Sequence, residues 1–309
     1  MAVTASLPAR AGMRAADWWS ALVVIVVWGL NFVVMKWGLE TLSPLLLCAL
    51  RFVAASLPFL WFVRPPRTVP WWLLAAYGLV QGVGQFGLLF TGMKLGMPAG
   101  MSSVVLQTQA FITLLLAAIF LQERPKPWQW AGLVVAIAGL LLIGTAHADS
   151  SAQMTLMGFL CTVGAAAMWA SSNLLTRVAA RYGSYEPVSF IVWTSVFPVL
   201  PLLMLSIGLE GWGAVSLQLA GMGAQQYAVV AYLALLSTLL GYGLWTRLLQ
   251  RYAASTVAPL SLLVPVIGLI SAMLLLGEWP TPVQWLGTLG VLLGMVINQF
   301  GGHWRKRQT

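Results

Sequence analysis

Long apolar runs dominate this 309-residue chain and constrain its fold more than any other feature. Only 7% of the residues are charged, whereas soluble domains average about 25%, so the chain lacks the charge to cover a soluble surface. Each run is about 20 residues long, which is enough for a helix to cross a bilayer. We predict an all-α membrane protein, because open strands leave backbone groups unsatisfied in lipid. Ten helices are expected: 18–37, 44–63, 71–93, 98–121, 128–146, 154–176, 187–208, 226–247, 255–276 and 281–301.

Aromatic and basic residues indicate how these helices cross the membrane. Trp residues gather near the expected helix ends, as in an interfacial belt: Trp18, Trp19, Trp61, Trp71, Trp72, Trp128, Trp212 and Trp304. If the N-terminus is cytoplasmic, 13 of the 16 Lys and Arg residues fall in cytoplasmic segments. The outer ends hold only Lys36 and Lys94. This bias sets the orientation, and an even number of helices places both termini in the cytoplasm.

A ten-residue pattern, E-x-P-x-P-x-Q-W-x-G, occurs twice, beginning at Glu123 and at Glu278. Each copy follows one apolar run and opens another, so it marks a structural unit that is present twice. A Trp and a basic residue eight positions apart also recur in the first and sixth helices: Trp28 with Lys36, and Trp169 with Arg177. Each unit holds five helices, an odd number, so the two units must have opposite orientations. Such inverted repeats are typical of secondary transporters, which bind substrate near the midplane between the halves.

Polar side chains in the third expected helix are candidates for a substrate site. Tyr77, Gln81 and Gln85 recur every four residues and therefore share one face. An uncharged amide can bind a carboxylate or an ammonium group without the full cost of a buried charge. The structural alternative is that these side chains join neighbouring helices, and both interpretations remain open.

The first and sixth helices carry aromatic and polar groups near their centres. Trp28 and Asn31 lie in the first, and Trp169, Ser172 and Asn173 lie in the sixth. A Trp at mid-span is not an interface anchor, and its ring can hold a substrate ammonium group by cation–π contact. Plain packing is the alternative, but the matching positions in the two repeats favour a binding site.

The fourth, eighth and ninth helices add further candidates. Ser103 and Gln107 are four residues apart and face the same way, whereas Gln109 points elsewhere. Tyr242 in the eighth helix completes the candidate site. In the ninth helix, Pro265 cannot donate a backbone hydrogen bond, so it frees a carbonyl group and bends the helix. That carbonyl either lines the path or is covered by a neighbour.

Charged residues inside the membrane are scarce. Arg51 alone lies well within a helix; it could attract a substrate carboxylate, but we favour bonds to carbonyl groups at helix ends. All acidic residues map to loops or helix ends: Asp17, Glu40, Glu123, Asp149, Glu186, Glu210 and Glu278. For Glu123 and Glu278 we expect capping and loop packing. Proton-coupled carriers usually place a carboxylate or His within the membrane, so we expect uniport or exchange down the substrate gradient.

Neither a nucleotide, a metal nor a catalytic group is expected. The chain has no P-loop pattern, and its only His residues, His147 and His303, lie at helix ends. Cys48 and Cys161 fall in apolar runs without metal-ligand spacing. We therefore expect no enzyme activity and no cofactor. The expected partners are a small-molecule substrate and the lipid bilayer, without nucleic acid despite the net charge of +9. A monomer is sufficient, and the oligomeric state stays open.

The chain resembles the EamA branch of the drug/metabolite transporter superfamily over nearly its whole length. The resemblance is carried by Trp28-Gly-Leu-Asn31-Phe32, Arg51-Phe52, Gly96-Met-Pro98-Ala-Gly100 and the long helices ending at Glu123 and Glu278. The stretches 105–111 and 259–265 are similar to bacterial amino-acid exporters. This resemblance implies two EamA-type repeats, residues 1–150 and 151–309, in a bacterial inner membrane. It also implies alternating-access export of aromatic or cysteine-type amino acids and related small metabolites.

Three other functions compete with amino-acid export. The first is export of another small metabolite or of a drug. An integral-membrane enzyme would need an intramembrane cluster of acid, His or Lys near one face, and the sequence shows none. A channel would give single-channel current rather than saturable flux.

Overall fold

The computed structural model describes residues 13–146, 154–252 and 254–305, and its regular elements there are all helical. Five membrane-crossing helices precede the 147–153 gap: α1 (Ala15–Thr41); α2 (Pro44–Ser56) with η1 (Leu57–Phe59); α3 (Trp71–Gly78), η2 (Leu79–Phe86) and α4 (Gly87–Lys94); α5 (Ala99–Val105), η3 (Leu106–Thr108) and α6 (Gln109–Phe120); and α7 (Pro127–Thr145). The same number follows it: α8 (Leu156–Arg181); α9 (Pro187–Thr194) with α10 (Val199–Glu210); α12 (Ala224–Ala231), η6 (Tyr232–Gly241) and α13 (Tyr242–Arg251); α14 (Ala254–Val257), η7 (Ala258–Leu262) and α15 (Leu263–Leu276); and α16 (Pro282–Arg305).

The expected ten-helix architecture is confirmed in the described residues. Nine helical spans are long and apolar enough to cross a membrane, and the segment Pro44–Phe59 is a shorter apolar helix. Four helices extend four or more residues past their predicted ends, α1 to Thr41, α16 to Arg305 and the two described next, because a charged residue interrupts an apolar run without ending the helix. The helix predicted to end at 176 continues to Arg181, and the one predicted to end at 247 continues to Arg251.

One short helix, α11 (Trp212–Ala220), was not predicted from the sequence. Gln218 holds it in place, since its Oε1 accepts from the backbone N–H of Ser43 at 2.7 Å and its Nε2 donates to Glu210 at 2.8 Å. Val215 is buried against the main core. The helix is too short to produce a membrane-length hydropathy signal, and these long-range contacts are what order it.

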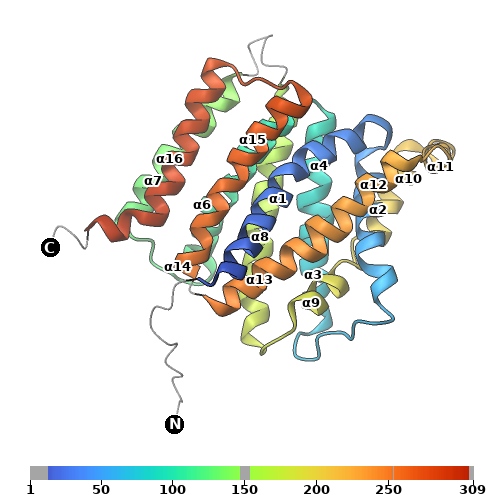
Figure 1. Cartoon of the computed structure of the whole chain (residues 1–309), viewed down its shortest axis with the longest axis horizontal. Coiled ribbons are helices and arrows are strands. Elements are labelled where there is room, and N and C mark those ends of the chain that lie inside the picture. The colour runs from blue at the N-terminus through green and yellow to red at the C-terminus, as the bar shows by residue number, and fades with distance from the viewer. Residues whose placement is uncertain (1–12, 147–153, 253, 306–309) are drawn as a thin grey trace.

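The two halves of the chain pack against each other along the whole bundle (Figure 1). Helix α1 lies against α15 and η6, α4 lies against α8, and α2 lies against α10. Helices α7 and α16 form a pair at one edge of the molecule. A first-half helix therefore meets a second-half helix in each of these contacts, so groups from both repeats can face one central space.

The repeated ten-residue motif has a structural explanation. Its second proline, Pro127 or Pro282, is the first residue of α7 or α16, a position where the missing N–H costs no helical bond. Its glutamine caps the same helix end. Gln129 Oε1 accepts from Lys126 N at 2.8 Å, and Gln284 Oε1 accepts from Thr281 N at 2.9 Å. The motif thus starts one helix in each half.

The glycine of the motif joins the α7–α16 pair. A Cβ atom on Gly132 would lie 2.5 Å from the carbonyl oxygen of Gly294, and one on Gly287 would lie 2.6 Å from that of Gly139. The two helices are therefore in backbone contact, as small residues permit within membranes. This pair is a scaffold at the edge of the bundle.

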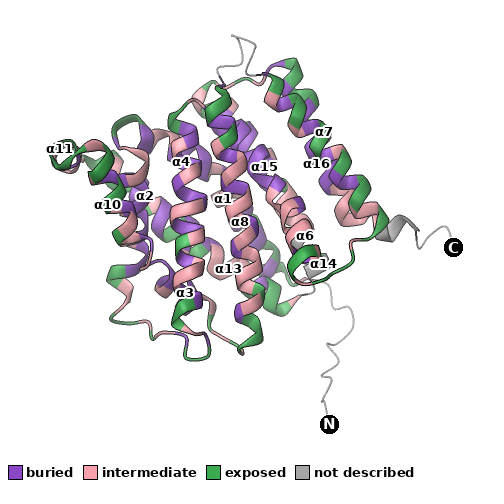
Figure 2. Cartoon of the chain, turned by 180° about the vertical axis from the view of Figure 1, so that it is seen from behind, coloured by how far each residue is buried: buried purple, intermediate pink, exposed green. Residues whose placement is uncertain are grey.

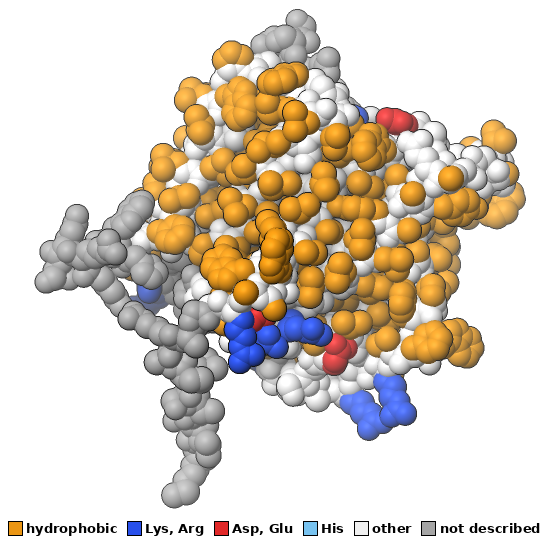
Figure 3. All heavy atoms as spheres, in the orientation of Figure 1, with side chains coloured by type: hydrophobic (Ala, Val, Ile, Leu, Met, Phe, Trp, Pro, Cys, Tyr) orange, Lys and Arg blue, Asp and Glu red, His pale blue; other side chains and the backbone are white. Residues whose placement is uncertain are grey.

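The surface matches a lipid environment. Apolar side chains cover the face shown in Figure 3, and the Lys and Arg side chains visible there gather toward its lower edge. Figure 2 shows the buried residues concentrated in the middle of the bundle. Trp18, Trp19, Trp61, Trp71 and Trp72 are all more than half exposed, which agrees with the predicted interfacial belt.

Candidate substrate site

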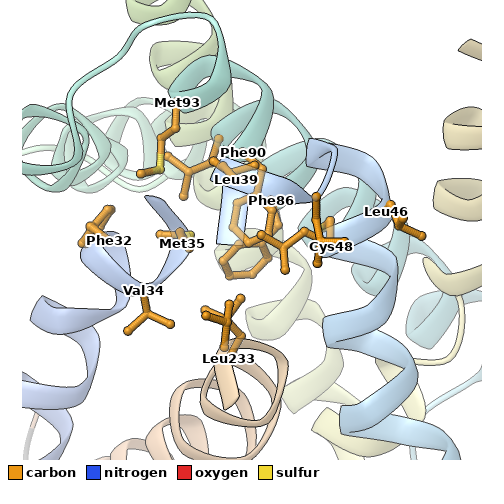
Figure 4. Close-up of a cluster of buried hydrophobic side chains, with 14 of the residues drawn as sticks. Phe32, Val34, Met35, Leu39, Leu46, Cys48, Phe86, Phe90, Met93 and Leu233 are labelled. Carbon is orange, nitrogen blue, oxygen red and sulfur yellow. The ribbon is translucent and has the colours of Figure 1, made fainter. Parts of the chain in front are cut away.

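A cluster of buried apolar side chains supports the candidate site (Figure 4). Phe32 and Met35 come from α1, Phe86 from η2, Phe90 from α4 and Leu233 from η6, so both halves contribute. Phe32 and Phe86 also line the cavity described below. The cluster therefore forms a rigid wall behind the polar groups.

The third helix of each half contains a π-helical segment, η2 in the first half and η6 in the second. Such segments are rare and are found frequently at functional sites. The wider turn of a π-helix changes which backbone N–H and C=O groups bond to each other. The carbonyl of Ser237 in η6 accepts a hydrogen bond from Trp28 Nε1 at 3.1 Å. Gly241 makes room for that ring, because a Cβ there would lie 2.4 Å from Trp28 Nε1.

Two adjoining cavities that share lining residues lie between the halves. The central chamber, of about 40 Å³, is lined by polar groups that include Asn31, Arg51, Gln85, Ser103 and Gln107. The larger chamber, of about 290 Å³, extends from the middle of the bundle to Tyr185 and Leu249. Both are lined by Trp28, Gln107, Trp169, Tyr242 and Val264. A solute in the larger chamber therefore contacts the entrance of the central one.

The larger chamber extends toward the end of the bundle that we call the basic end. This end carries most of the described basic side chains, among them Arg64, Arg67, Arg177, Arg181 and Arg251. Two ion pairs lie there: Arg177 with Glu123 at 3.0 Å, and Arg251 with Asp17 at 2.8 Å. Glu123 therefore packs the segment after α6 against α8 through this ion pair, which agrees with the loop-packing part of the sequence-based expectation.

Aromatic rings line the junction of the two chambers. The ring of Trp28 lies 5.1 Å from that of Tyr242 and 5.5 Å from that of Trp245. Trp169 lines both chambers from α8. Trp245 was not singled out from the sequence. Its position one turn after Tyr242 on α13 was the available signal.

The polar residues of the third helix face the interior. Gln81 Nε2 donates to the hydroxyl of Tyr242 at 2.9 Å, and both residues line a small neighbouring cavity with Tyr77. The Tyr77 ring packs on Phe190 at 4.9 Å and also lines the larger chamber. Gln85 lines the central chamber, and its Oε1 has no hydrogen-bond partner in the described structure.

The two predicted asparagines lie in different chambers. Asn31 lines the central chamber; its Nδ2 contacts only the sulfur of Met35 at 3.7 Å, and its Oδ1 has no partner among the described residues. Asn173 lines the larger chamber and donates to Gln109 Oε1 at 2.8 Å. Ser172 differs from both: its hydroxyl bonds to the Trp169 carbonyl on its own helix, and it does not line either chamber.

The fourth and ninth helices meet through side-chain to backbone bonds. Ser103 Oγ donates to the carbonyls of Gly100 and Pro265, at 2.6 and 3.3 Å. Gln107 Nε2 donates to the carbonyl of Ser261, four residues before Pro265, at 3.2 Å. Pro265 has no N–H with which to bond the Ser261 carbonyl. A residue of the neighbouring helix, the candidate site residue Gln107, donates a hydrogen bond to it.

Arg51 does not bond to helix-end carbonyls as expected. It is fully buried, its Nε donates to Thr238 Oγ1 at 2.9 Å, and its Nη2 donates to Ser237 Oγ at 3.4 Å. Its guanidinium carbon lies 3.9 Å from the centre of the Phe86 ring. The π-helical segment η6 supplies both hydroxyls, so Arg51 binds side chains of the opposite half.

The model of the EamA-like transporter family matches this chain twice, over residues 17–145 and 156–299. The chain belongs to the EamA-like transporter family. It is thus a multi-pass membrane transporter. A "Probable amino-acid metabolite efflux pump" of Salmonella typhimurium is 43% identical, with 96% of this chain and 98% of the relative covered. A protein of the same name from Escherichia coli is 42% identical over 93% of this chain and 95% of the relative.

More distant relatives share the family and the fold. A "Probable terminal-alkyne amino-acid exporter" of Streptantibioticus cattleyicolor is 27% identical over 91% of this chain and 93% of its own length. A solved crystal structure at 17% identity superimposes with a TM-score of 0.58, covering 92% of this chain and 96% of that one. At this identity the likeness concerns the fold alone.

The opposite end of this EamA-like transporter is closed above the central chamber. Gly268 packs on Ser103, and a Cβ there would lie 2.6 Å from the Ser103 side chain. Beyond this contact lies a separate surface cavity of about 280 Å³, lined by Lys36, Gly100 and Glu278. One turn of α5, from Gly100 to Ser103, therefore separates this cavity from the central chamber.

Glu278 links the two halves at this closed end. Its Oε2 accepts from the backbone N–H of Gly100 at 3.1 Å, so it caps a helix of the other half, as its expected capping role required. Burial raises the pKa of the Glu278 carboxyl, although the Gly100 N–H and the charge of Lys36 act in the opposite direction. No cluster of metal-binding side chains occurs among the described residues of this transporter.

Proposed function

We propose that this EamA-like transporter exports amino acids and closely related small metabolites across a bacterial inner membrane. The observation that carries the proposal is the pair of adjoining chambers, which both halves line with amide, hydroxyl and aromatic groups. These groups can bind the polar and apolar parts of an amino acid together. The names of the relatives from Salmonella typhimurium and Escherichia coli support the substrate class.

The proposed site combines groups from both repeats: Trp28, Asn31, Tyr77, Gln81, Gln85, Ser103, Gln107, Trp169, Ser172, Asn173 and Tyr242. The aromatic rings at the junction hold the substrate side chain or its ammonium group. Gln85 and Asn31 offer unpaired amide oxygens in the central chamber. Gln81 and Ser172 act indirectly, since they position Tyr242 and Trp169 through hydrogen bonds.

The basic end lies in the cytoplasm in this proposal, because cytoplasmic segments of membrane proteins are enriched in Lys and Arg. The larger chamber then receives substrate from the cytoplasm, while the packing of Gly268 on Ser103 blocks the outer side. Export requires the two inverted halves to rock about the central chamber until the closed side opens. The halves are residues 1–150 and 151–309, and their boundary lies outside the described residues.

Counterflow in liposomes tests the proposal. Purified protein is reconstituted with an unlabelled amino acid inside, and uptake of the same radiolabelled amino acid is measured for L-phenylalanine, L-leucine and L-cysteine. Exchange of at least one, saturable and absent from empty liposomes, is expected. If none of the three amino acids is exchanged but an unrelated metabolite is, the proposed substrate class is wrong. Single-channel current without saturation would instead indicate a channel.

Two variants test the site within the same assay. Gln85→Ala and Trp169→Ala should each reduce exchange severalfold while leaving the folded yield and the thermal unfolding temperature unchanged. Trp61→Ala is the matched control, because Trp61 is 90% exposed and distant from both chambers. If Gln85→Ala and Trp169→Ala lower thermal stability but retain transport, their role is packing.

A further inference from the structure

Arg51 has a nitrogen that nothing in the described structure binds. Thr238 and Ser237 accept from Nε and Nη2, but Nη1 is buried without a hydrogen-bond partner. An Arg guanidinium presents donors in a planar fork that matches the two oxygens of a carboxylate. The Thr238 and Ser237 hydroxyls of η6 accept hydrogen bonds from Nε and Nη2 on one edge of the guanidinium. Nη1 is left without a hydrogen-bond partner among the described residues.

The charge of Arg51 also lacks a counter-ion. No described carboxylate forms an ion pair with it; the two ion pairs among the described residues join Glu123 with Arg177 and Asp17 with Arg251 at the basic end. The Phe86 ring and two neutral hydroxyls offset only part of the cost of burying a cation. Buried charges in membrane proteins normally pair or mark the path of a solute.

Arg51 lies at a cavity that adjoins the larger chamber. The side chain lines the central chamber, which shares Trp28, Trp169 and Tyr242 with the larger chamber. The central chamber, at about 40 Å³, is of the order of one water molecule, whose share of liquid volume is roughly 30 Å³. In this geometry the central chamber has room for little more than one water molecule, so a charged head group fits only after the two halves rock apart, while the larger chamber accommodates a side chain.

The same chamber contains acceptors without donors. Gln85 Oε1 and Asn31 Oδ1 are buried and have no partner in the described part of the chain. Amide oxygens accept hydrogen bonds from ammonium groups. One chamber thus combines an unpaired cationic donor with unpaired neutral acceptors, which is the complement of a zwitterionic head group.

We propose that Arg51 binds the carboxylate of the transported solute through Nη1, while Gln85 and Asn31 accept hydrogen bonds from its ammonium group. This inference rests on the proposed function and narrows it to solutes with a free carboxylate. It also assigns a substrate contact to a residue for which the sequence favoured a structural role. Amines and amino-acid amides, which lack the carboxylate, are poor substrates because they place no anion opposite Arg51.

The first test compares acids with amides on the wild-type transporter. Counterflow of L-phenylalanine, L-leucine or L-cysteine, whichever is exchanged, is inhibited with the unlabelled amino acid and with its amide. The amide should inhibit roughly ten- to a hundredfold more weakly, the range for a lost hydrogen bond to a charged group. Equal inhibition by acid and amide would overturn the assignment of Arg51 and leave the proposed amino-acid export intact.

The second test asks whether Arg51 causes this preference. Arg51→Gln should weaken inhibition by the acid about tenfold or more while changing inhibition by the amide little, so that the two become alike. Arg51→Lys keeps the charge without the planar fork and should retain part of the preference. Arg67→Gln is the matched control, since Arg67 is an exposed arginine outside both chambers.

The possible outcomes separate the two proposals. A folded Arg51→Gln variant that still prefers the acid would refute the role of Arg51. If Arg51→Gln gives no folded protein, Arg51→Lys and the wild-type comparison decide the question, and an unchanged preference in Arg51→Lys at full affinity counts against the contact through Nη1. Absence of exchange of all three amino acids by the wild type would instead refute the proposed function.

Discussion

The side chain of Gln107 donates a hydrogen bond from Nε2 to the backbone carbonyl of Ser261, 3.2 Å away. Pro265, four residues further along, has no N–H to donate to that carbonyl. A side chain of the first half therefore supplies a donor to a carbonyl of the second half, beside the backbone N–H of Leu263, in the wall of the larger chamber.

This relationship predicts a non-additive pair of substitutions. Gln107→Leu removes the donor and should destabilise the protein by about 0.5–2 kcal/mol, the range for hydrogen bonds between membrane helices. Pro265→Ala restores an N–H four residues after Ser261. The double variant should therefore lose less stability than the sum of the single losses. Thermal unfolding in detergent measures all four proteins, and strictly additive losses would show that Gln107 does not compensate for Pro265.

A topology prediction follows from the basic end. The positive-inside rule places Lys126 in the cytoplasm and Thr281, in the equivalent position of the inverted repeat, outside. In a background without Cys48 and Cys161, a membrane-impermeant thiol reagent should label Trp279→Cys in intact cells, because Trp279 is exposed in the same segment, whereas Thr281 itself is buried. Lys126→Cys should be labelled only after the cells are opened. The reverse pattern would invert the orientation and place the mouth of the larger chamber on the outer side of the membrane.

Glu278 should make stability depend on pH. Burial raises the pKa of this carboxyl above its ordinary value of 4.5, so the unfolded state loses its proton first as the pH rises. As the pH rises from the ordinary pKa to the raised pKa of the folded state, the protein loses the stability that the protonated Glu278 carboxyl contributes. Glu278→Gln keeps an acceptor for the Gly100 N–H and should remove this loss. Unfolding temperatures measured from pH 4 to 7 should fall more steeply in the wild type than in the variant; parallel curves would contradict this.

Transport should not be driven by a proton gradient. No described acidic or His side chain lines the two adjoining chambers, and the guanidinium of Arg stays protonated at accessible pH. Liposomes with an imposed pH gradient should therefore equilibrate substrate without accumulating it. Uphill accumulation would show proton coupling. Its loss in Lys36→Gln or Glu278→Gln would then identify the closed-end cavity as the proton site.

The sequence by itself predicted most of the fold. Apolar runs of membrane length define helices, because lipid leaves the backbone no other partner. The repeated motif, with its odd number of helices per copy, predicted inverted halves before any contact was known. What it missed was local: α11 is too short for a hydropathy signal, and α8 and α13 run past the basic residues at which their apolar runs stop.

The candidate site was predictable only as a set of residue types. Helical spacing put Ser103 and Gln107 on one face, and both line the central chamber, but Gln109, which was expected to point elsewhere, lines the larger chamber together with Gln107. Spacing could not show that Ser172 bonds within its own helix or that Trp245 completes the aromatic wall. The Ser172 bond is local to α8, whereas the place of Trp245 depends on how helices of the opposite halves cross.

Arg51 illustrates which properties of a residue can be predicted from the sequence and which depend on the tertiary structure. The sequence determined that a cation is buried in the second helix, since its neighbours are apolar over a membrane-length run. Only the packing of that helix against η6 decided which atoms meet the guanidinium. The hydroxyls of Ser237 and Thr238 are far away in the chain, and they leave Nη1 of an arginine that lines a cavity without a partner among the described residues. Local sequence patterns define the helices, whereas a binding site arises where groups that are distant in the chain come within hydrogen-bonding range, and tertiary packing alone determines that proximity.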